Sequence, residues 1–348
     1  MKPIKLAIVG LGRAGKGMHL SELAGKEDMF EVYAVCDIIE ERRRAVAEKY
    51  NCKAYASIEE VIADPEVEIV DIATRSCDHF AHAMMALKAG KNVFLEKPIC
   101  CTYEDAKALM AYADAHPEVK LYIRHNRRWE KMFCKGMELA DSGLLGNVVE
   151  VRLARNGFTG RYDWQTISKF GGGQLLNWGP HIIDHALNFC GGDYKDIYCE
   201  TRQTLASGDC EDHIKLLLTG VNNRIVDMEI SSCVATFVPL LVIYGDRGAA
   251  YQDPVTKKFC WKYLKPGFEF IKPEPDPNTP EGWCAPQQLE WVEGEMTPEE
   301  SKDTLDETWV AMYEDFRNGK PYPILHEQAL KVVEVIGKIK DIMAEKTK

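Results

Sequence analysis

The feature of this sequence that most constrains its fold is a glycine-rich turn near the start of the chain. The apolar run "KLAIVG" leads directly into Gly10, Gly12 and Gly15, which are spaced as G-x-G-x-x-G, and a helical stretch follows. In a strand–turn–helix unit, Gly10 permits the tight turn, Gly12 lets the backbone approach a pyrophosphate, and Gly15 lets helix and strand pack closely. The helix N-terminus then presents unpaired N–H groups to the phosphates. In this context the motif predicts a dinucleotide-binding site.

An acidic residue at the end of the next apolar run, "EVYAVCD", bears on which dinucleotide binds. Asp37 lies 25 residues after Gly12, near the spacing of an acid that accepts hydrogen bonds from the adenosine ribose hydroxyls. Its carboxylate repels a 2′-phosphate, and the next residues, Ile38 and Ile39, offer no cation. We therefore expect NAD as the cofactor. NADP is the weaker alternative, because an arginine of the cluster at 42–44 is able to turn toward a phosphate.

Short apolar runs alternate with amphipathic stretches as far as residue 126, and this alternation predicts a parallel sheet with crossover helices. Beyond residue 126 the strand-like runs are longer and follow one another directly, which favours a large, mostly antiparallel open sheet. We expect an α/β protein with two domains, a Rossmann NAD-binding domain at 1–126 and a second α/β domain at 127–348. The strands expected in the first domain are residues 5–10, 31–37, 68–74, 91–97 and 119–126.

One long segment of the second domain has neither a helix period nor a strand period. It runs from Lys265 to Asp303 and contains seven of the 16 prolines. We expect a long surface excursion there, and one of this length sometimes serves as a lid or a subunit contact.

Composition excludes several classes of partner and location. The formal net charge of −11 argues against nucleic acid or an anionic membrane as the main partner. No stretch approaches the roughly 20 apolar residues of a membrane span, and "MKPIKLAIVG" lacks the pattern of a secretory signal. The 12 cysteines are scattered without a CxxC pair, which favours reduced thiols over a disulfide scaffold. We expect a cytoplasmic protein.

A second group of polar residues lies in "FGGGQLLNWGPHIIDHAL". His181 lies four residues after Asn177, and Asp184 and His185 lie three and four residues after His181, so the four share one face if the run is helical. The two histidines have the i,i+4 spacing that zinc favours, but no second ligand cluster accompanies them, so we expect no metal and a structural role for His185. Pro180 is tolerated only in a first helical turn, which puts Asn177 at the N-cap. The same side chain is equally able to bind substrate.

Several ordered motifs resemble those of the glucose–fructose oxidoreductase and inositol dehydrogenase (Gfo/Idh/MocA) family over nearly the whole chain. They are "GLGRAG", the "CD" that ends the second strand, "ATRSCDHFAHAMMALKAGKNVFLEKP", "HNRRW", the GGG helix and a closing "NGKPYPI". The resemblance implies reversible hydride transfer between a nicotinamide and a secondary alcohol or ketone of a sugar, sugar derivative or cyclitol. It also implies a second domain that binds substrate and whose sheet forms homodimers or homotetramers.

The resemblance also assigns roles position by position. Lys97 matches the family's catalytic lysine and His181 its catalytic histidine, while Asn177 stands where the family has the aspartate of this trio. Arg75 and Ser76 replace the usual Pro-Asn, which leaves the local cofactor contacts open. The residues implied to bind the cofactor are Gly10, Gly12, Arg13, Ala14, Gly15, Asp37, Ile38, Thr74, Arg75, His79, Glu96 and Lys97. Those implied to bind substrate are Lys97, Arg128, Trp164, Asn177, His181 and Asp184.

The expected chemistry needs a base beside the reacting alcohol, because a hydride leaves carbon more easily when the hydroxyl proton leaves as well. We expect His181 to be that base, and Lys97 to hold the hydroxyl oxygen, stabilise a developing alkoxide or relay the proton. Two other classes stay open. One is a non-catalytic sugar sensor, which only the missing carboxylate at residue 177 favours, and the other is a glycosidase that uses bound NAD transiently.

Overall fold

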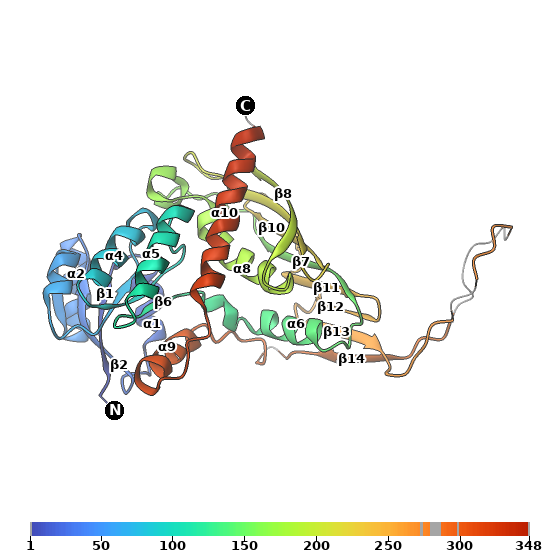
Figure 1. Ribbon diagram of the computed structural model, residues 1–348, viewed down its shortest axis with the longest axis horizontal. Helices are drawn as coiled ribbons and strands as arrows, with labels where there is room; N and C mark the ends of the chain where they lie inside the picture. Colours follow the sequence, from blue (N-terminus) through green and yellow to red (C-terminus); the bar gives the residue numbers. More distant parts are fainter. Residues whose placement is uncertain (1, 272–273, 279–286, 298, 347–348) are drawn as a thin grey trace.

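The first layer of the molecule is a six-stranded parallel sheet. The computed structural model describes residues 2–271, 274–278, 287–297 and 299–346 (Figure 1). The strand order is β3-β2-β1-β4-β5-β6, so the order reverses between β1 and β4. Ligands of open parallel sheets bind at the carboxyl edge beside such a reversal. The strands are β1 (Ile4–Val9), β2 (Phe30–Cys36), β3 (Lys53–Tyr55), β4 (Ile69–Ile72), β5 (Asn92–Leu95) and β6 (Leu121–Ile123).

Five of these strands confirm the expected runs, and β3 is an addition. It has only three residues, two of them exposed, which is too short and too polar to give a strand pattern. The runs expected at 68–74, 91–97 and 119–126 each extend beyond the strand that they contain. Their last residues leave the sheet at its carboxyl edge and form the loops that line the cavity described below.

Helices that connect the strands bury the apolar side chains of this sheet in one continuous core. The helix after the glycine-rich turn is short and starts with a π-helical turn, in which the N–H of His19 donates to the carbonyl of Ala14 (3.0 Å). The helical segments are η1 (Gly15–His19), α1 (Leu20–Glu22), α2 (Glu40–Tyr50), α3 (Ile58–Ala63), η2 (Ser76–Asp78), α4 (His79–Lys88) and α5 (Tyr103–Ala115).

The second layer is an eight-stranded sheet in the order β14-β13-β12-β11-β7-β10-β9-β8. Every neighbouring pair is antiparallel except β7 and β10, where Val151 lies opposite Val226 in a parallel register. This confirms the mostly antiparallel sheet. The strands are β7 (Val148–Asn156), β8 (Tyr194–Arg202), β9 (His213–Gly220), β10 (Ile225–Ser231), β11 (Leu241–Gly245), β12 (Gly248–Gln252), β13 (Phe259–Leu264) and β14 (Trp291–Glu295).

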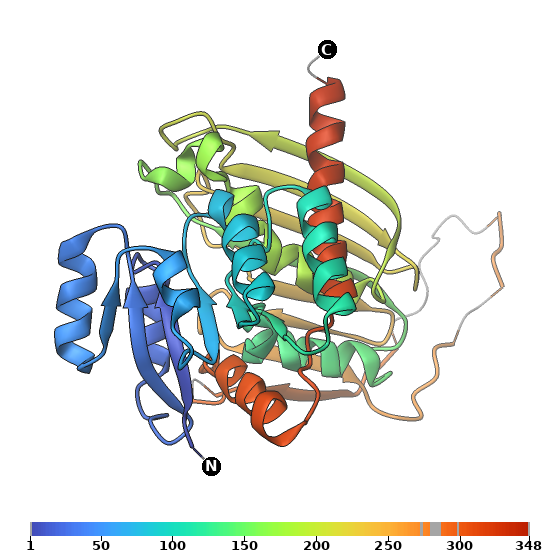
Figure 2. The same ribbon diagram turned by 60° about the vertical axis from the view of Figure 1, so that its left-hand side comes forward.

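The helices of the second layer pack on the inner face of this sheet and complete a second core. Figure 2 shows them between the two sheets. Among the described helices, none has the length and apolarity needed to span a bilayer. The helical segments are η3 (Asn126–Trp129), α6 (Lys131–Asp141), η4 (Trp164–Thr166), η5 (Ser168–Phe170), α7 (Gln174–Asn177), α8 (Gly179–Phe189) and α10 (His326–Lys346). The remaining helix, α9 (Glu307–Asn318), packs on the first core.

The excursion expected at 265–303 is partly wrong, because it contains an edge strand. β14 pairs with β13, for example Val292 with Tyr263, and Lys265 N–H donates to the carbonyl of Glu290 (2.9 Å). Because glutamates and a glycine interrupt the alternation of apolar residues in β14, its sequence shows no strand period. The remaining described residues between the two strands run away from the body (Figure 1), and residues 272–273, 279–286 and 298 lie outside the described part.

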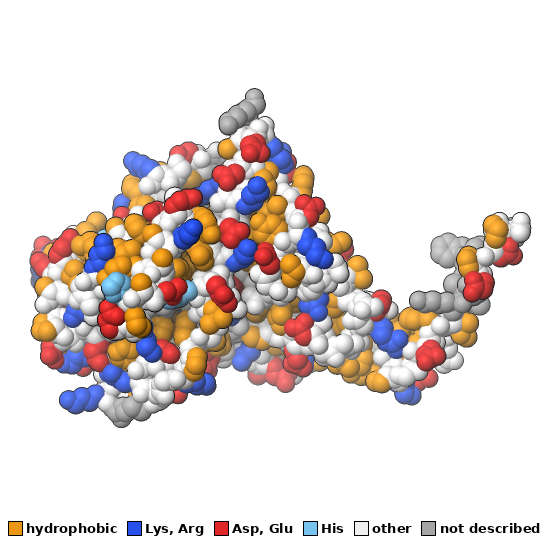
Figure 3. All heavy atoms as spheres, in the orientation of Figure 1, with side chains coloured by type: hydrophobic (Ala, Val, Ile, Leu, Met, Phe, Trp, Pro, Cys, Tyr) orange, Lys and Arg blue, Asp and Glu red, His pale blue; other side chains and the backbone are white. Residues whose placement is uncertain are grey.

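Two C-terminal helices join the layers. Trp309 and Met312 of α9 are fully buried in the first core, although they lie far beyond residue 126. α10 packs against α5 of the first layer and α8 of the second. This differs from the expected division at residue 126, because the chain returns to the first layer to cover its core. Figure 3 shows acidic and basic side chains interspersed over one face of the assembled molecule.

Candidate functional site

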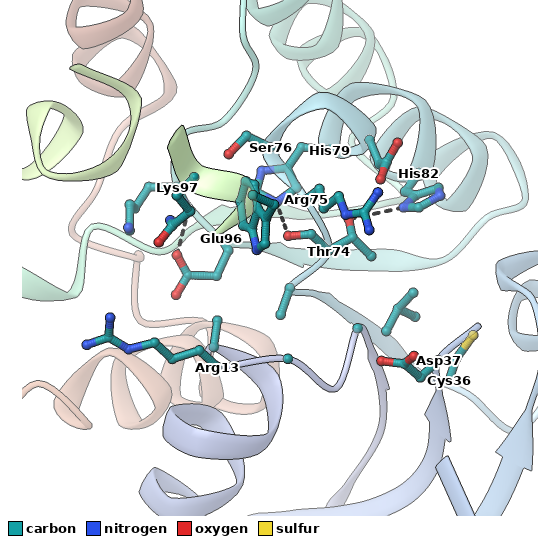
Figure 4. A pocket seen from close by; sticks show the side chains of 18 of the residues that line it. Arg13, Cys36, Asp37, Thr74, Arg75, Ser76, His79, His82, Glu96 and Lys97 are labelled. Atoms are coloured by element: carbon teal, nitrogen blue, oxygen red, sulfur yellow. Dashed lines mark hydrogen bonds between the residues drawn. The ribbon is translucent and has the colours of Figure 1, made fainter. Parts of the chain in front are cut away.

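A cavity of about 730 Å³ lies at the carboxyl edge of the first sheet, where residues of the second layer face it. Figure 4 shows Asp37 toward one end of the cavity and Lys97 toward the other, with Arg13 below Lys97. Gly15, Arg128 and Asp184 do not line it. The expected site residues that do are Gly10, Gly12, Arg13, Ala14, Asp37, Ile38, Thr74, Arg75, His79, Glu96, Lys97, Trp164, Asn177 and His181.

The glycine-rich loop has the geometry that its motif predicts. Gly10 has a φ of +96°, and a Cβ there would lie 2.6 Å from the carbonyl oxygen of Ala73 on β4's loop. A Cβ on Gly15 would lie 2.0 Å from the carbonyl oxygen of Gly10, so helix and loop pack in direct contact. A Cβ on Gly12 would meet no described atom within 4 Å, because this residue faces the cavity. The loop therefore leaves room for a pyrophosphate against its backbone.

Asp37 is held by the backbone at the end of β2. Its Oδ2 accepts a hydrogen bond from the N–H of Leu11 (2.8 Å), and its Oδ1 accepts one from the N–H of Ile39 (2.8 Å). Each carboxylate oxygen keeps a further lone pair for a ligand hydroxyl. Arg42 Nη1 lies 4.0 Å from Oδ2 and also lines the cavity. The glycine loop and this oriented carboxylate fit a dinucleotide with free ribose hydroxyls.

The loop after β4 contains the Arg75-Ser76 departure. The Arg75 guanidinium stacks on the ring of Phe170, 4.4 Å from its centroid, and so contacts the second layer. His79 lies with Nδ1 2.6 Å from the carbonyl oxygen of Pro98 and Nε2 3.3 Å from that of Thr74. His79 thus ties the loop after β4 to the loop after β5, in addition to lining the cavity.

Lys97 leaves the end of β5 and reaches toward the second layer. Its Nζ donates a hydrogen bond to the backbone carbonyl of Asn177 (3.1 Å). Its own N–H donates to Glu96 Oε2 (2.9 Å). Burial lowers the pKa of the Lys97 amine, and the nearby guanidiniums of Arg124 and Arg127 lower it further, while the Glu96 carboxylate opposes them. The result is a pKa below the ordinary lysine value, which suits a group that exchanges a proton.

His181 lies on α8 and is buried, with 6% of its surface exposed. Its Nδ1 is buried without a hydrogen-bond partner among the described residues. Burial lowers the pKa of the imidazole well below 6.5, and the positive charges of Lys97 and Arg127 lower it further. His181 is therefore a neutral imidazole across the physiological pH range, which is the form a base requires.

The expected N-cap role of Asn177 is wrong. Asn177 is the last residue of α7, and the N-cap of α8 is Trp178, whose side chain makes no capping hydrogen bond. Gly173, with φ +100°, starts the helix before Asn177, and Pro180 interrupts it after one turn. The Asn177 side chain instead accepts from Gln165 Nε2 (3.3 Å) and lines the cavity.

Arg128 and Asp184 pair with each other outside the cavity. Arg128 Nε and Nη2 donate to the two carboxylate oxygens of Asp184 at 2.8 and 2.6 Å. His185 has its Nε2 2.9 Å from the carbonyl oxygen of Arg127 and stacks on Phe133, which is the structural role expected for it. Asp184 and His185 are therefore both engaged by other protein groups. Within the described residues, no group of three or more His, Cys, Asp or Glu is arranged to hold a metal ion.

The sequence analysis missed several residues of the second-layer wall. Arg127 lines the cavity in place of Arg128, and its guanidinium stacks on Trp178 at 4.4 Å from the ring centroid. The two arginines are neighbours in the 3₁₀-helix η3, where successive side chains point about 120° apart. Only one of them can face the cavity, and the letters "RR" do not say which. The other residues of this wall that were missed are Asn126, Arg161, Asp163, Gln165 and Trp178.

Comparison with known proteins matches both layers to one family. Residues 4–125 match the model described as "Oxidoreductase family, NAD-binding Rossmann fold", and residues 135–251 match the GFO/IDH/MocA C-terminal domain. A Schizosaccharomyces pombe protein named uncharacterized oxidoreductase C115.03 is 31% identical over 232 residues, which cover 63% of this chain and 61% of that protein. The chain thus spans about three fifths of this relative's length.

Two further similarities extend over almost the whole chain. The scyllo-inositol 2-dehydrogenase (NADP(+)) IolW of Bacillus subtilis is 25% identical over 353 residues, covering 99% of this chain and 94% of that protein. The crystal structure of an NAD-binding protein from Listeria innocua superposes with a TM-score of 0.80 at 25% identity, covering 100% of this chain and 96% of that one.

Proposed function

Because the chain belongs to the Gfo/Idh/MocA family of oxidoreductases with an NAD-binding Rossmann fold, we propose that it is an NAD-dependent dehydrogenase. Its proposed reaction is hydride transfer between the nicotinamide and a secondary alcohol or ketone of a sugar, sugar derivative or cyclitol. The observation that carries the proposal is that Lys97 and His181, from different layers, line the same cavity as the glycine-rich loop and Asp37. The inositol dehydrogenase named among the relatives supports the substrate class.

The cofactor would be held by the first layer. The loop from Gly10 to Gly15 would take the pyrophosphate, and Asp37 would accept hydrogen bonds from the adenosine ribose. We propose NAD over NADP because Asp37 is fixed by two backbone N–H groups and cannot turn away from a 2′-phosphate. When bound, the nicotinamide supplies the hydride acceptor of alcohol oxidation.

Lys97 and His181 would share the work on the substrate hydroxyl. His181 is neutral and would take the hydroxyl proton, since its lowered pKa keeps the ring free to accept it. Lys97 would donate a hydrogen bond to the same oxygen and stabilise the charge that develops on it. In ketone reduction the roles reverse, and the protonated group returns its proton to the oxygen. Arg127 and Trp178 would form the wall beside the sugar ring.

The test is a spectrophotometric screen for NADH formation with a panel of aldoses, sugar acids and inositols, repeated in reverse with keto-sugars and NADH. We expect at least one substrate to give turnover that needs Lys97. Binding of NAD and a sugar without turnover across the panel would indicate the sensor class instead. Release of a leaving group from a glycoside without net NADH, seen by product analysis, would indicate the glycosidase class.

A further inference from the structure

A buried row of alternating charges lies beneath Lys97 in the first layer. His19 Nδ1 is 2.7 Å from Asp71 Oδ2, and its Nε2 is 3.0 Å from Glu96 Oε1. Arg124 Nη1 donates to the same Glu96 oxygen at 2.5 Å, and its Nη2 donates to Glu22 Oε1 at 2.7 Å. The side chains of His19, Asp71 and Arg124 are fully buried. The row therefore excludes water, and each member depends on its neighbours for charge balance.

The geometry makes His19 a cation. Both of its ring nitrogens face carboxylate oxygens, which accept hydrogen bonds and do not donate them when ionised. Each nitrogen must then carry a proton. In agreement, burial and the Arg124 guanidinium oppose the charge, but the Asp71 and Glu96 carboxylates together raise the pKa of His19 to about 9. Trp309 packs edge-on against the ring with centroids 5.5 Å apart and closes the remaining side.

The row ends at the backbone of Lys97. Glu96 Oε1 accepts hydrogen bonds from His19 Nε2 and Arg124 Nη1. Its other oxygen, Oε2, accepts a hydrogen bond from the backbone N–H of Lys97 (2.9 Å). The carboxylate is thus fixed by two cations on one oxygen and holds the catalytic lysine's main chain with the other. His19 itself is the last residue of η1, the helical turn that opens directly from the glycine-rich loop. One buried imidazolium therefore connects the cofactor loop to the residue at the reacting centre.

We propose that His19 is a positioning residue for Lys97: as a buried cation between Asp71 and Glu96, it fixes the carboxylate that holds the Lys97 backbone. This inference rests on the proposed function only where it assigns Lys97 a catalytic role. The row of charges itself is present in the protein without substrate. His19 also neutralises part of the charge of Glu96, the carboxylate that raises the pKa of the Lys97 amine. The other charged groups that face this amine are Arg124, Arg127 and Arg13, which lower its pKa.

The experiment replaces His19 by a residue of similar reach without the charge. His19→Gln keeps one donor for a carboxylate but removes the cation, so the amine of Lys97 should hold its proton to higher pH. We label the lysines by reductive ¹³C-methylation, identify the Lys97 signal with Lys97→Arg, and titrate it by NMR. The midpoint of that signal should move upward by about half to one pH unit. His116→Gln, at an exposed histidine that stacks on Tyr112, is the matched control and should leave it unchanged.

Turnover gives the second readout. With a substrate from the panel, His19→Gln should lower kcat by about tenfold and change KM less than threefold, because a misplaced Lys97 weakens transition-state contacts more than ground-state binding. A folded His19→Gln protein whose Lys97 signal titrates as in the native protein would overturn the proposal. If the native protein shows no turnover with any substrate, the proposed function fails, and the Lys97 titration still decides the role of His19.

Asp71→Asn serves if His19→Gln does not fold. It keeps the size and one acceptor for His19 but removes the carboxylate that stabilises the imidazolium. The pKa of His19, followed by NMR, should then fall from about 9. The Lys97 signal should move as His19 loses its proton, because the two groups share Glu96. Independent titration of the two residues would contradict the coupling.

Discussion

The two walls of the cavity contain buried charge in opposite ways. Behind the first-layer wall, cations and carboxylates alternate from Asp71 to Glu22, and Lys97 is attached to this paired row. On the second-layer wall, His181 has positive groups among its neighbours, and residue 177 is an amide in place of the carboxylate that the family resemblance implies. Paired charges fix each other's protonation and position, whereas an unpaired imidazole responds to pH and to the ligand beside it. The first wall thus fixes the position of Lys97, and the second holds His181, the group that we propose gains and loses the proton.

The largest expected effect comes from removing the positive charge of Lys97, which the first wall positions. Lys97→Met preserves the length and volume of the side chain but leaves the substrate oxygen without its donor. We expect kcat to fall by on the order of 10²-fold or more, roughly 2.7 kcal/mol or more in activation free energy. NAD affinity, measured by calorimetry, should change only a few-fold. Lys107→Met, at an exposed lysine of α5, is the control. Near-native turnover of Lys97→Met would assign the donor role to another group.

The next effect tests whether the first wall really depends on the His19 cation. Its folded pKa of about 9 is raised above the unfolded value of 6.5, so its stabilisation is complete below pH 6.5 and is lost as pH rises through 9. The native protein should lose about 2 kcal/mol of unfolding free energy between pH 7 and pH 9.5 through this group. Urea unfolding at a series of pH values measures the loss. His19→Gln should be less stable at pH 7 and lack this decline, and parallel curves for the two proteins would contradict the assignment.

A smaller effect concerns the far end of the first wall, where Asp37 is proposed to bind the adenosine ribose. NAD should bind at least tenfold more tightly than NADP, about 1.4 kcal/mol, because the fixed carboxylate repels a 2′-phosphate. Asp37→Ser should narrow the ratio of NAD affinity to NADP affinity by improving NADP binding. The guanidinium of Arg42 at the cavity edge should attract the 2′-phosphate. Glu48→Gln removes an exposed carboxylate of α2 and should leave the ratio unchanged. Calorimetric titrations that give equal affinities for the native protein would refute the preference.

The smallest expected effect comes from adding a carboxylate to the second wall, which makes it resemble the first. Asn177→Asp restores a carboxylate near His181, which favours the protonated imidazole and raises its pKa. Since the base must be neutral, the acid limb of kcat/KM for alcohol oxidation should move upward by on the order of one pH unit. Asn318→Asp adds the same charge at an exposed position of α9 and should not move the limb. An unmoved limb in an active Asn177→Asp enzyme would show that His181 is not the titrating base or that residue 177 does not affect it.

The same contrast explains how much could be predicted from the sequence. Glycine spacing and alternating apolar runs predicted the first sheet, the cavity edge and Asp37, because these features depend on local backbone geometry. The second wall depends on which side chains face inward from short irregular helices. Arg128 was chosen where Arg127 lines the cavity, and Asn177 was expected at a cap that Trp178 occupies.

Long-range pairing was the other source of error. His19 lies in a stretch that reads as an ordinary helix, and its partners Asp71 and Glu96 are 52 and 77 residues away. β14 has a polar sequence and forms only because β13 presents an edge to it. In each case the deciding contact joins residues far apart in the chain, so no local period could reveal it.

The burial of Trp309 in the first core has a consequence for how this chain matures on the ribosome. The six strands of the first sheet are all made by residue 123, but the indole that packs against Phe94 and donates to Glu22 is made nearly 190 residues later. Until then the sheet has its carboxyl-edge loops but lacks part of its apolar cover. Part of the apolar cover of the first sheet is thus made long after its strands.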